Sequence, residues 1–124
     1  MKDQMVIASI QMYSTGDKER NLQTMEKYLE HINKDFPNIK MVVFPELAAH
    51  GSISNMRKEA EIIPGELTSI FSNMANKYNL WLIPGSIYEK SDNEIFNTTP
   101  VFSSSGDLLG KYRKRYPWRP NEKT

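Results

Sequence analysis

The chain has 124 residues and no cysteine; 39% of its residues are hydrophobic and 25% are charged. This length and composition predict one globular domain, and the lack of cysteine excludes disulfides, thiolate metal sites and a thiol nucleophile within these residues. The formal net charge of +1 gives no global field that would attract nucleic acid or a membrane. No window approaches the roughly 20 apolar residues of a membrane span, and the N-terminal apolar run is too short for a secretory signal, so we expect a cytoplasmic protein.

The first half of the chain predicts a strand, a helix and a second strand. Residues 5–12 form a short apolar run, rich in β-branched side chains, that is typical of a buried strand. Asp17 offers a helix cap, and Pro37 ends the helix. The apolar face of this helix steps by three and four residues, through Leu22, Met25, Leu29, Ile32 and Phe36. A second apolar run, 41–44, predicts a strand parallel to the first, because a helix connects the two.

The second half predicts one more helix and three more strands. Residues 48–63 are weakly patterned and indicate a loop with a short helical turn. Pro64 and Gly65 then open a helix whose apolar face comprises Leu67, Ile70, Phe71, Met74 and Tyr78. Residues 80–86 predict the third strand. Residues 94–105 and 108–114 predict a hairpin that turns at Gly106 and Asp107 and has an edge or a bulge near Pro100.

These elements predict an α/β domain. At least three of the strands look buried on both faces, and such sheets need cover on each side. Two convincing helices are few for five strands. We therefore expect helices on one face of the sheet and part of the cover of the other face to lie outside this chain.

Glu46 follows Phe44 and Pro45 at the end of the second apolar run. Ligands bind beyond the carboxyl ends of parallel strands, and an acid flanked there by apolar residues would be partly desolvated. Desolvation raises the pKa of a carboxyl group toward that of a useful general base. The simpler alternative is that Glu46 faces solvent after a strand, as most acids do.

The C-terminal stretch is locally basic and holds five cations within nine residues: Lys111, Arg113, Lys114, Arg115 and Arg119. Charge of this kind usually marks a solvated sheet edge that resists aggregation. A nucleic-acid arm is an alternative, since Tyr112, Tyr116 and Trp118 could stack on bases. Two prolines stiffen the segment, however, and no basic stripe runs through the rest of the chain. We expect no nucleic-acid partner and no membrane partner.

Taken together, the two stretches resemble the first two signatures of the nitrilase, or carbon–nitrogen hydrolase, superfamily. These are "VVFPEL", which contains Glu46, and "GKYRK", which contains Lys114. The resemblance covers essentially the whole chain in order, including "IASIQM", "IPGELTSIF" and "FNTTPVF". The continuation from Lys114 to Glu122, K-x-x-P-W-x-P-x-E, is similar to the aliphatic amidase and formamidase branch. Leu47 departs from the aromatic residue expected at its position in aliphatic amidases.

The resemblance implies a role for each of three residues. Glu46 would be the general base, Lys114 the cation that stabilises the oxyanion, and Glu122 a supporting acid. Attack by a thiolate on an amide puts negative charge on the carbonyl oxygen, which a fixed ammonium offsets. A carboxylate takes the thiol proton and later activates water for the acyl-enzyme. We expect neither a metal nor a cofactor, and a structural or surface role for Arg113 and Arg115.

The family's nucleophile is a cysteine beyond the lysine, in a domain about twice this length. We therefore interpret residues 1–124 as a partial carbon–nitrogen hydrolase domain, the N-terminal half of a nitrilase-like α-β-β-α sandwich with a mixed sheet and helices on one face. In full-length form it would hydrolyse a small amide, or a nitrile, as a homo-oligomer. Alone it would be inactive. The alternative is a non-catalytic module that binds a partner through its open sheet face. His31 would be a surface residue and His50 a loop-packing residue.

Overall fold

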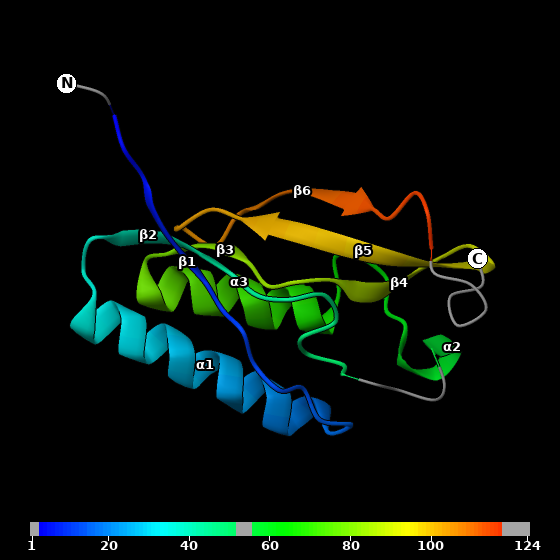
Figure 1. Ribbon diagram of the computed structural model, residues 1–124. Coiled ribbons are helices and arrows are strands. Elements are labelled where there is room, and N and C mark those ends of the chain that lie inside the picture. The colour runs from blue at the N-terminus through cyan, green and yellow to red at the C-terminus, as the bar shows by residue number, and fades with distance from the viewer. Residues whose placement is uncertain (1–2, 52–55, 118–124) are drawn as a thin grey trace.

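A computed structural model describes residues 3–51 and 56–117. Within these ranges the chain forms one six-stranded mixed sheet and three helices (Figure 1). The elements are, in order, β1 (Val6–Ser9), α1 (Lys18–Asp35), β2 (Ile39–Val43), α2 (Met56–Glu59), α3 (Glu66–Tyr78), β3 (Trp81–Ile83), β4 (Ile87–Ser91), β5 (Glu94–Phe102) and β6 (Leu108–Arg113). The expected mixed α/β class is confirmed.

The sheet changes direction between its two halves. Strands β1, β2 and β3 run parallel, with Val42 paired to both Ala8 and Leu82. Strand β5 is antiparallel to all its neighbours. One of its edges pairs with β3 at Phe102 and with β4 along residues 94–98, and its other edge pairs with β6. Strands β2 and β6 therefore run in the same direction, and the carboxyl end of β6 lies opposite Thr98 in the middle of β5.

The two long helices begin and end at residues that satisfy their free backbone groups. The Asp17 carboxylate accepts a hydrogen bond from the Arg20 amide at 3.1 Å and caps α1. At the start of α3, the Gly65 amide donates to the Thr68 hydroxyl at 2.7 Å. Asn79 ends α3 in the left-handed conformation, with φ of 51°. Capping thus sets the bounds of both helices from local sequence.

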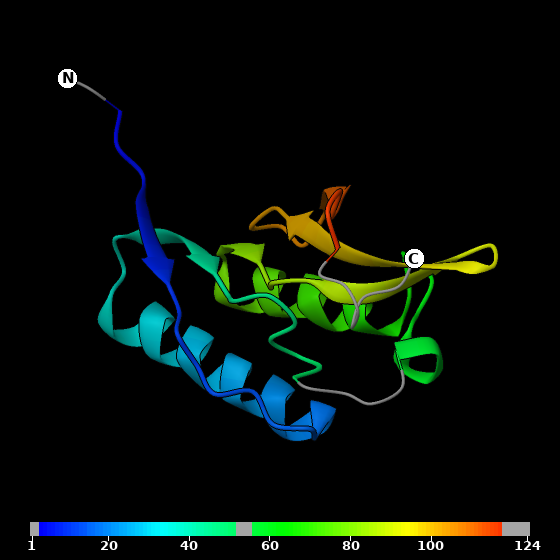
Figure 2. The same ribbon diagram turned by 45° about the vertical axis from the view of Figure 1, so that its right-hand side comes forward.

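All three helices cover the same face of the sheet (Figures 1 and 2). The core lies between that face and α1 and α3, and it includes Met25, Leu29, Val42, Leu67, Phe71, Leu82, Ile87 and Phe102, all at most 1% exposed. Side chains alternate between the faces of a strand, so the neighbours of Val42 and Leu82 point to the other face and are only partly buried. Val6 and Ile7 are 42% and 52% exposed.

Four sequence-based details need correction. The strand expected at 5–12 ends at Ser9, although the Ile10 amide still donates to the Val43 carbonyl. Phe36 is the C-cap of α1 and is 48% exposed instead of facing the core. The strand expected at 80–86 stops at Ile83, and β4 was not predicted. The strands are not buried on both faces, because the described residues supply helices to one face alone.

Two other expectations hold. Helix α2 is the short helical turn expected within 48–63. Pro100 lies next to an irregularity of the β5–β6 ladder, between Val101 and Phe102. Pro100 has no amide to donate, so a bulge beside it disturbs the ladder little.

Candidate active site

Glu46 lies in a tight turn directly after β2. Its successor Leu47 adopts a left-handed conformation, with φ of 53°, which is uncommon for a residue with a side chain. The Leu47 amide donates to the Ser86 hydroxyl at 3.0 Å, and the Ala48 amide donates to the Pro45 carbonyl at 3.2 Å. The first bond ties the turn to the loop between β3 and β4, and the second closes the turn itself, so that Glu46 is held at the edge of the sheet.

Gly85 makes this close approach feasible. It has φ of 82°, and a Cβ built on it would lie 1.9 Å from the Pro45 carbonyl oxygen. Any side chain at this position would therefore push the Glu46 turn away from the β3–β4 loop. At Gly110, in β6, no atom lies within 4 Å of a built Cβ.

We therefore expect Gly85→Ala to lower the free energy of unfolding by about 2 kcal/mol or more, through positive φ and overlap with the backbone. The matched change Gly110→Ala should stay within about 0.5 kcal/mol of the parent chain. Urea unfolding of the three proteins measures both values. Equal stability of the Gly85 and Gly110 variants would show that the contact with Pro45 does not constrain the turn.

Lys114 directly follows β6 and meets Glu46. Its Nζ lies 2.9 Å from Glu46 Oε1, although 68 residues separate the two in sequence. The Lys114 amide donates to the Asn97 carbonyl at 2.8 Å, and this bond continues the β5–β6 ladder by one residue. The two strand ends thus converge at one edge of the sheet.

Asn97 is a third member of this cluster. Its side-chain Nδ2 donates to Glu46 Oε1 at 2.9 Å, alongside Lys114. Asn97 belongs to the motif "FNTTPVF", but no contact of its side chain was predicted from the sequence. A signal was available: Asn97 alternates along β5 with Phe96 and Thr98, so its side chain leaves the sheet on the other face.

An open pocket of about 260 Å³ surrounds the pair. It is lined by Phe44, Glu46, Ile83, Gly85, Ser86, Asn97, Thr99, Tyr112 and Lys114. The side chains of Glu46 and Lys114 are 56% and 31% exposed. The partial desolvation predicted for Glu46 is therefore wrong for the described part of this chain, because the pocket lacks a wall on its solvent side.

The other residues singled out from the sequence lie elsewhere. Glu122 falls outside the described residues. Arg113 turns away from the pocket and pairs with Glu89, and Arg115 is exposed. His31 is a surface residue that pairs with Asp35.

His50 lies in the loop after Glu46 but does not line the pocket. It is 1% exposed, and its ring packs against Tyr88 with centroids 5.3 Å apart. Burial, with a smaller effect from the Lys18 charge, lowers the pKa of His50 to about 4. Its ring nitrogens find no hydrogen-bond partner among the described residues. A neutral ring packed in this way agrees with a loop-packing role.

Two classes of feature are absent from the part of the chain that the structure describes. Residues 3–51 and 56–117 contain no group of three or more His, Asp or Glu side chains that could hold a metal ion. None of their helices is long and apolar enough to cross a membrane.

Known proteins resemble this chain in sequence. The family profile for carbon-nitrogen hydrolases matches residues 6–124. The omega-amidase NIT3 of Saccharomyces cerevisiae is 37% identical over 109 residues, which cover 82% of this chain and 37% of that protein. The omega-amidase NIT2 of Danio rerio is 33% identical over 109 residues, covering 87% of this chain and 39% of that protein. A formamidase of Bacillus cereus is 27% identical over 114 residues, which cover 88% of this chain and 34% of that protein.

A solved structure of one of these relatives has a similar fold. The crystal structure of S. cerevisiae Nit3, a member of branch 10 of the nitrilase superfamily, matches with a TM-score of 0.82 and 31% identity. The match covers 90% of this chain and 44% of that one. The expected nitrilase-like fold is confirmed. The chain spans less than half the length of each of these relatives.

Proposed function

Because the chain belongs to the carbon-nitrogen hydrolase family, we propose that it supplies the general base and the oxyanion-stabilising cation of an amide hydrolase. The observation that supports this most is the 2.9 Å contact between Glu46 and Lys114. Each residue lies just beyond the end of a strand, and both line one pocket. A carboxylate and an ammonium in contact can divide proton transfer and charge stabilisation between them.

In this proposal the nucleophile is a cysteine thiol outside residues 1–124. Glu46 accepts the thiol proton while the sulfur attacks the amide carbon, and Lys114 donates a hydrogen bond to the carbonyl oxygen as it becomes negative. Protonated Glu46 then gives its proton to the nitrogen, and the C–N bond breaks. Ammonia departs, and the acyl group remains bound to the cysteine as a thioester. Glu46 next takes a proton from water, and the hydroxide attacks the thioester. The carboxylic acid product departs as Glu46 returns that proton to the sulfur and the thiol re-forms.

The hydrogen bonds around Glu46 suit this division of labour. Asn97 and Lys114 both donate to Oε1, so we assign proton transfer to Oε2. Lys114 carries three N–H donors and can bind Glu46 and a substrate oxygen together. Asn97 would keep the carboxylate in one orientation throughout the reaction. Glu122 would act as the supporting acid, as the sequence motif implies.

We propose a small amide as substrate. Identity is higher to the two omega-amidases, at 37% and 33%, than to the formamidase, at 27%. This difference favours the terminal amide of a short acid over formamide. The pocket of about 260 Å³ has room for either. Nitriles are a second substrate class within the proposal. The proposal also includes assembly of the full-length protein into homo-oligomers.

A graft tests the proposal. Residues 1–124 would replace the matching segment of the yeast omega-amidase, whose remainder would complete the domain. We expect ammonia release from succinamate, and Lys114→Ala should lower kcat about 10²–10³-fold through loss of the oxyanion donor. Glu46→Gln should cost about 10²–10⁴-fold. The matched control Arg115→Ala removes the neighbouring exposed cation and should stay near the parent rate.

The same graft examines the second candidate role, a non-catalytic binding module. Exposed apolar side chains along β1 and β6, among them Ile7 and Leu109, favour such a role. A graft that folds, as shown by a cooperative thermal transition, yet releases no ammonia would support the module and overturn the hydrolase. Full activity in the Lys114→Ala graft would remove Lys114 from the mechanism.

A further inference from the structure

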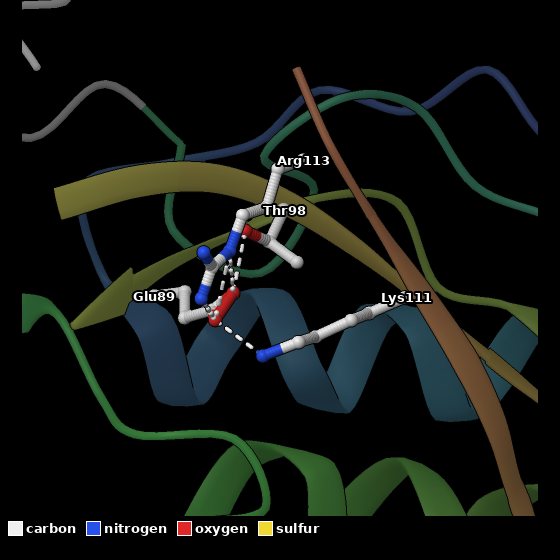
Figure 3. Close-up of polar contacts among 4 residues, drawn as sticks. All are labelled: Glu89, Thr98, Lys111 and Arg113. Carbon is white, nitrogen blue, oxygen red and sulfur yellow. Dashed lines mark hydrogen bonds and ion pairs between the residues drawn. The ribbon is translucent and has the colours of Figure 1, made fainter. Parts of the chain in front are cut away.

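Glu89 is a buried carboxylate that the proposed reaction does not use. It lies on β4, is 1% exposed, and accepts hydrogen bonds from three side chains (Figure 3). Arg113 donates through its terminal nitrogen at 2.6 Å and through Nε at 3.2 Å, and the Thr98 hydroxyl donates at 2.9 Å. Lys111 donates from its ammonium group. We call Glu89, Thr98, Lys111 and Arg113 the Glu89 cluster.

The Glu89 cluster ties together two strands that are not neighbours. Strands β4 and β6 pair with opposite edges of β5, and Glu89 reaches across β5 over Thr98 to meet β6. Within β5, Thr98 pairs with Ile87 on one side and with Arg113 on the other. Arg113 also stacks over the ring of Phe96, 4.1 Å from its centroid. Through its hydrogen bonds, the Glu89 carboxylate therefore connects side chains of three adjacent strands, β4, β5 and β6.

The cluster and the pocket lie on opposite faces of β6. Lys111 and Arg113 reach Glu89, whereas Tyr112 and Lys114 line the pocket. Successive side chains of a strand alternate in this way, so a slip of one residue would exchange the two sets. Lys114 would then leave the pocket, and a different cation would face Glu46.

Little else along β6 specifies its register. Residues 108–112 are all exposed, Gly110 has no side chain, and the ladder is irregular opposite Val101 and Phe102. Backbone hydrogen bonds re-form equally well after a slip, because they carry no sequence information. The buried contacts of β6 at Glu89 are sequence-specific and costly to break.

We propose that Glu89 is a positioning residue for the Glu46–Lys114 site, which it serves by holding Lys111 and Arg113 on the helix-covered face of β6. The importance of Glu89 for catalysis rests on the proposed function. Its effect on the position of Lys114 does not depend on that function. Without the Glu89 charge, Lys111 and Arg113 lose their buried partner. After a slip of one residue they turn to the pocket face, and one of them takes the place of Lys114 opposite Glu46.

The test is made by NMR on the labelled 124-residue chain. Two readouts report the position of Lys114: cross-relaxation between its side chain and that of Glu46, and hydrogen exchange of its amide, which bonds to the Asn97 carbonyl. In Glu89→Gln we expect the cross-relaxation to disappear and the amide to exchange at least about tenfold faster. Spectra of α1 and β1 should stay unchanged.

The matched control is Glu26→Gln. Glu26 joins α1 to α3 by accepting hydrogen bonds from Lys77 at 2.8 Å and Tyr78 at 3.0 Å. The same chemical change there should leave both Lys114 readouts as in the parent chain. Glu89→Asp, which keeps the charge on a shorter side chain, should restore part of the contact.

If Glu89→Gln does not fold, Arg113→Lys carries the test. It keeps the charge but loses the forked pairing, so the Lys114 readouts should shift in the same direction by a smaller amount. An unchanged Lys114–Glu46 contact in a folded Glu89→Gln chain, or in Arg113→Lys where the first does not fold, would overturn the proposal. Neither readout requires turnover. Failure of the hydrolase proposal can therefore be distinguished from failure of the Glu89 proposal.

Discussion

The purified 124-residue chain should release no ammonia above background from formamide, acetamide, propionamide or succinamate. It holds the proposed base and the proposed cation but no thiol, so no acyl-enzyme can form. Enzymes that lose their nucleophile often keep some rate enhancement from the rest of the site. That remainder depends on a dry pocket, and here Glu46 is 56% exposed. Water screens Lys114 from a developing oxyanion, so we expect a near-total loss.

Ammonia assays at millimolar substrate measure this directly. The decisive comparison adds Glu46→Gln and Lys114→Ala to the parent chain. Turnover that is present in the parent and vanishes in both variants would mean that residues 1–124 hold a complete site with another nucleophile. Turnover that survives both substitutions would point to a contaminating enzyme.

Acid should weaken the fold through Glu89. Burial by itself raises the pKa of this carboxyl group, but hydrogen bonds from Arg113, Lys111 and Thr98 outweigh burial and lower the pKa to about 2, from an ordinary 4.5. A carboxyl whose pKa is depressed in the folded state contributes stability above its unfolded pKa. That contribution is lost as the pH falls from about 4.5 through about 2.

We therefore expect Glu89→Gln to lower the free energy of unfolding at pH 7 by about 2–3 kcal/mol, since it leaves two cations without their buried partner. Below about pH 2 the parent and the variant should converge. Urea unfolding at several pH values between 2 and 7 tests this.

Glu26→Gln serves as the control for the acid prediction. The pKa of Glu26 is also lowered, first by its hydrogen bond with Lys77 and then by that with Tyr78. Its side chain is 39% exposed, however, so its loss should cost less than that of Glu89. A constant difference between parent and Glu89→Gln across the whole pH range would show that Glu89 acts by packing and not by charge.

The main features of the site follow from sequence because they depend on local rules. Apolar runs with a helix between them predict parallel strands, whose carboxyl ends meet at one edge of a sheet. Glu46 comes directly after such a run. Lys114 ends a strand whose hairpin turn at Gly106 is visible in the sequence; Gly106 does adopt a positive φ of 87°. Turn chemistry and strand periodicity therefore predicted that each residue lies at the end of a strand, whereas the pairing of the two side chains was implied by the resemblance to the carbon–nitrogen hydrolases.

The missed features depend on contacts between distant residues. Strand β4 reads as mixed because it carries Glu89 and Lys90, and a charged residue in a strand predicts exposure. Glu89 is buried because Lys111 and Arg113, more than 20 residues away in sequence, supply the compensating charge. A turn signal was present at Asp92 and Asn93, and Asp92 has φ of 53°. The exposure of Glu46 depends on which surfaces remain uncovered, and no local pattern encodes that.

We propose that Glu46 and Lys114 act together in acyl transfer from an amide to a thiol. The most direct measurement is the intact mass of the grafted enzyme during the first turnovers with succinamate. We predict a transient increase in mass that corresponds to a thioester in the parent graft and in Arg115→Ala, and none in Glu46→Gln or Lys114→Ala. A thioester that forms at the parent rate in either of the last two variants would contradict the claim.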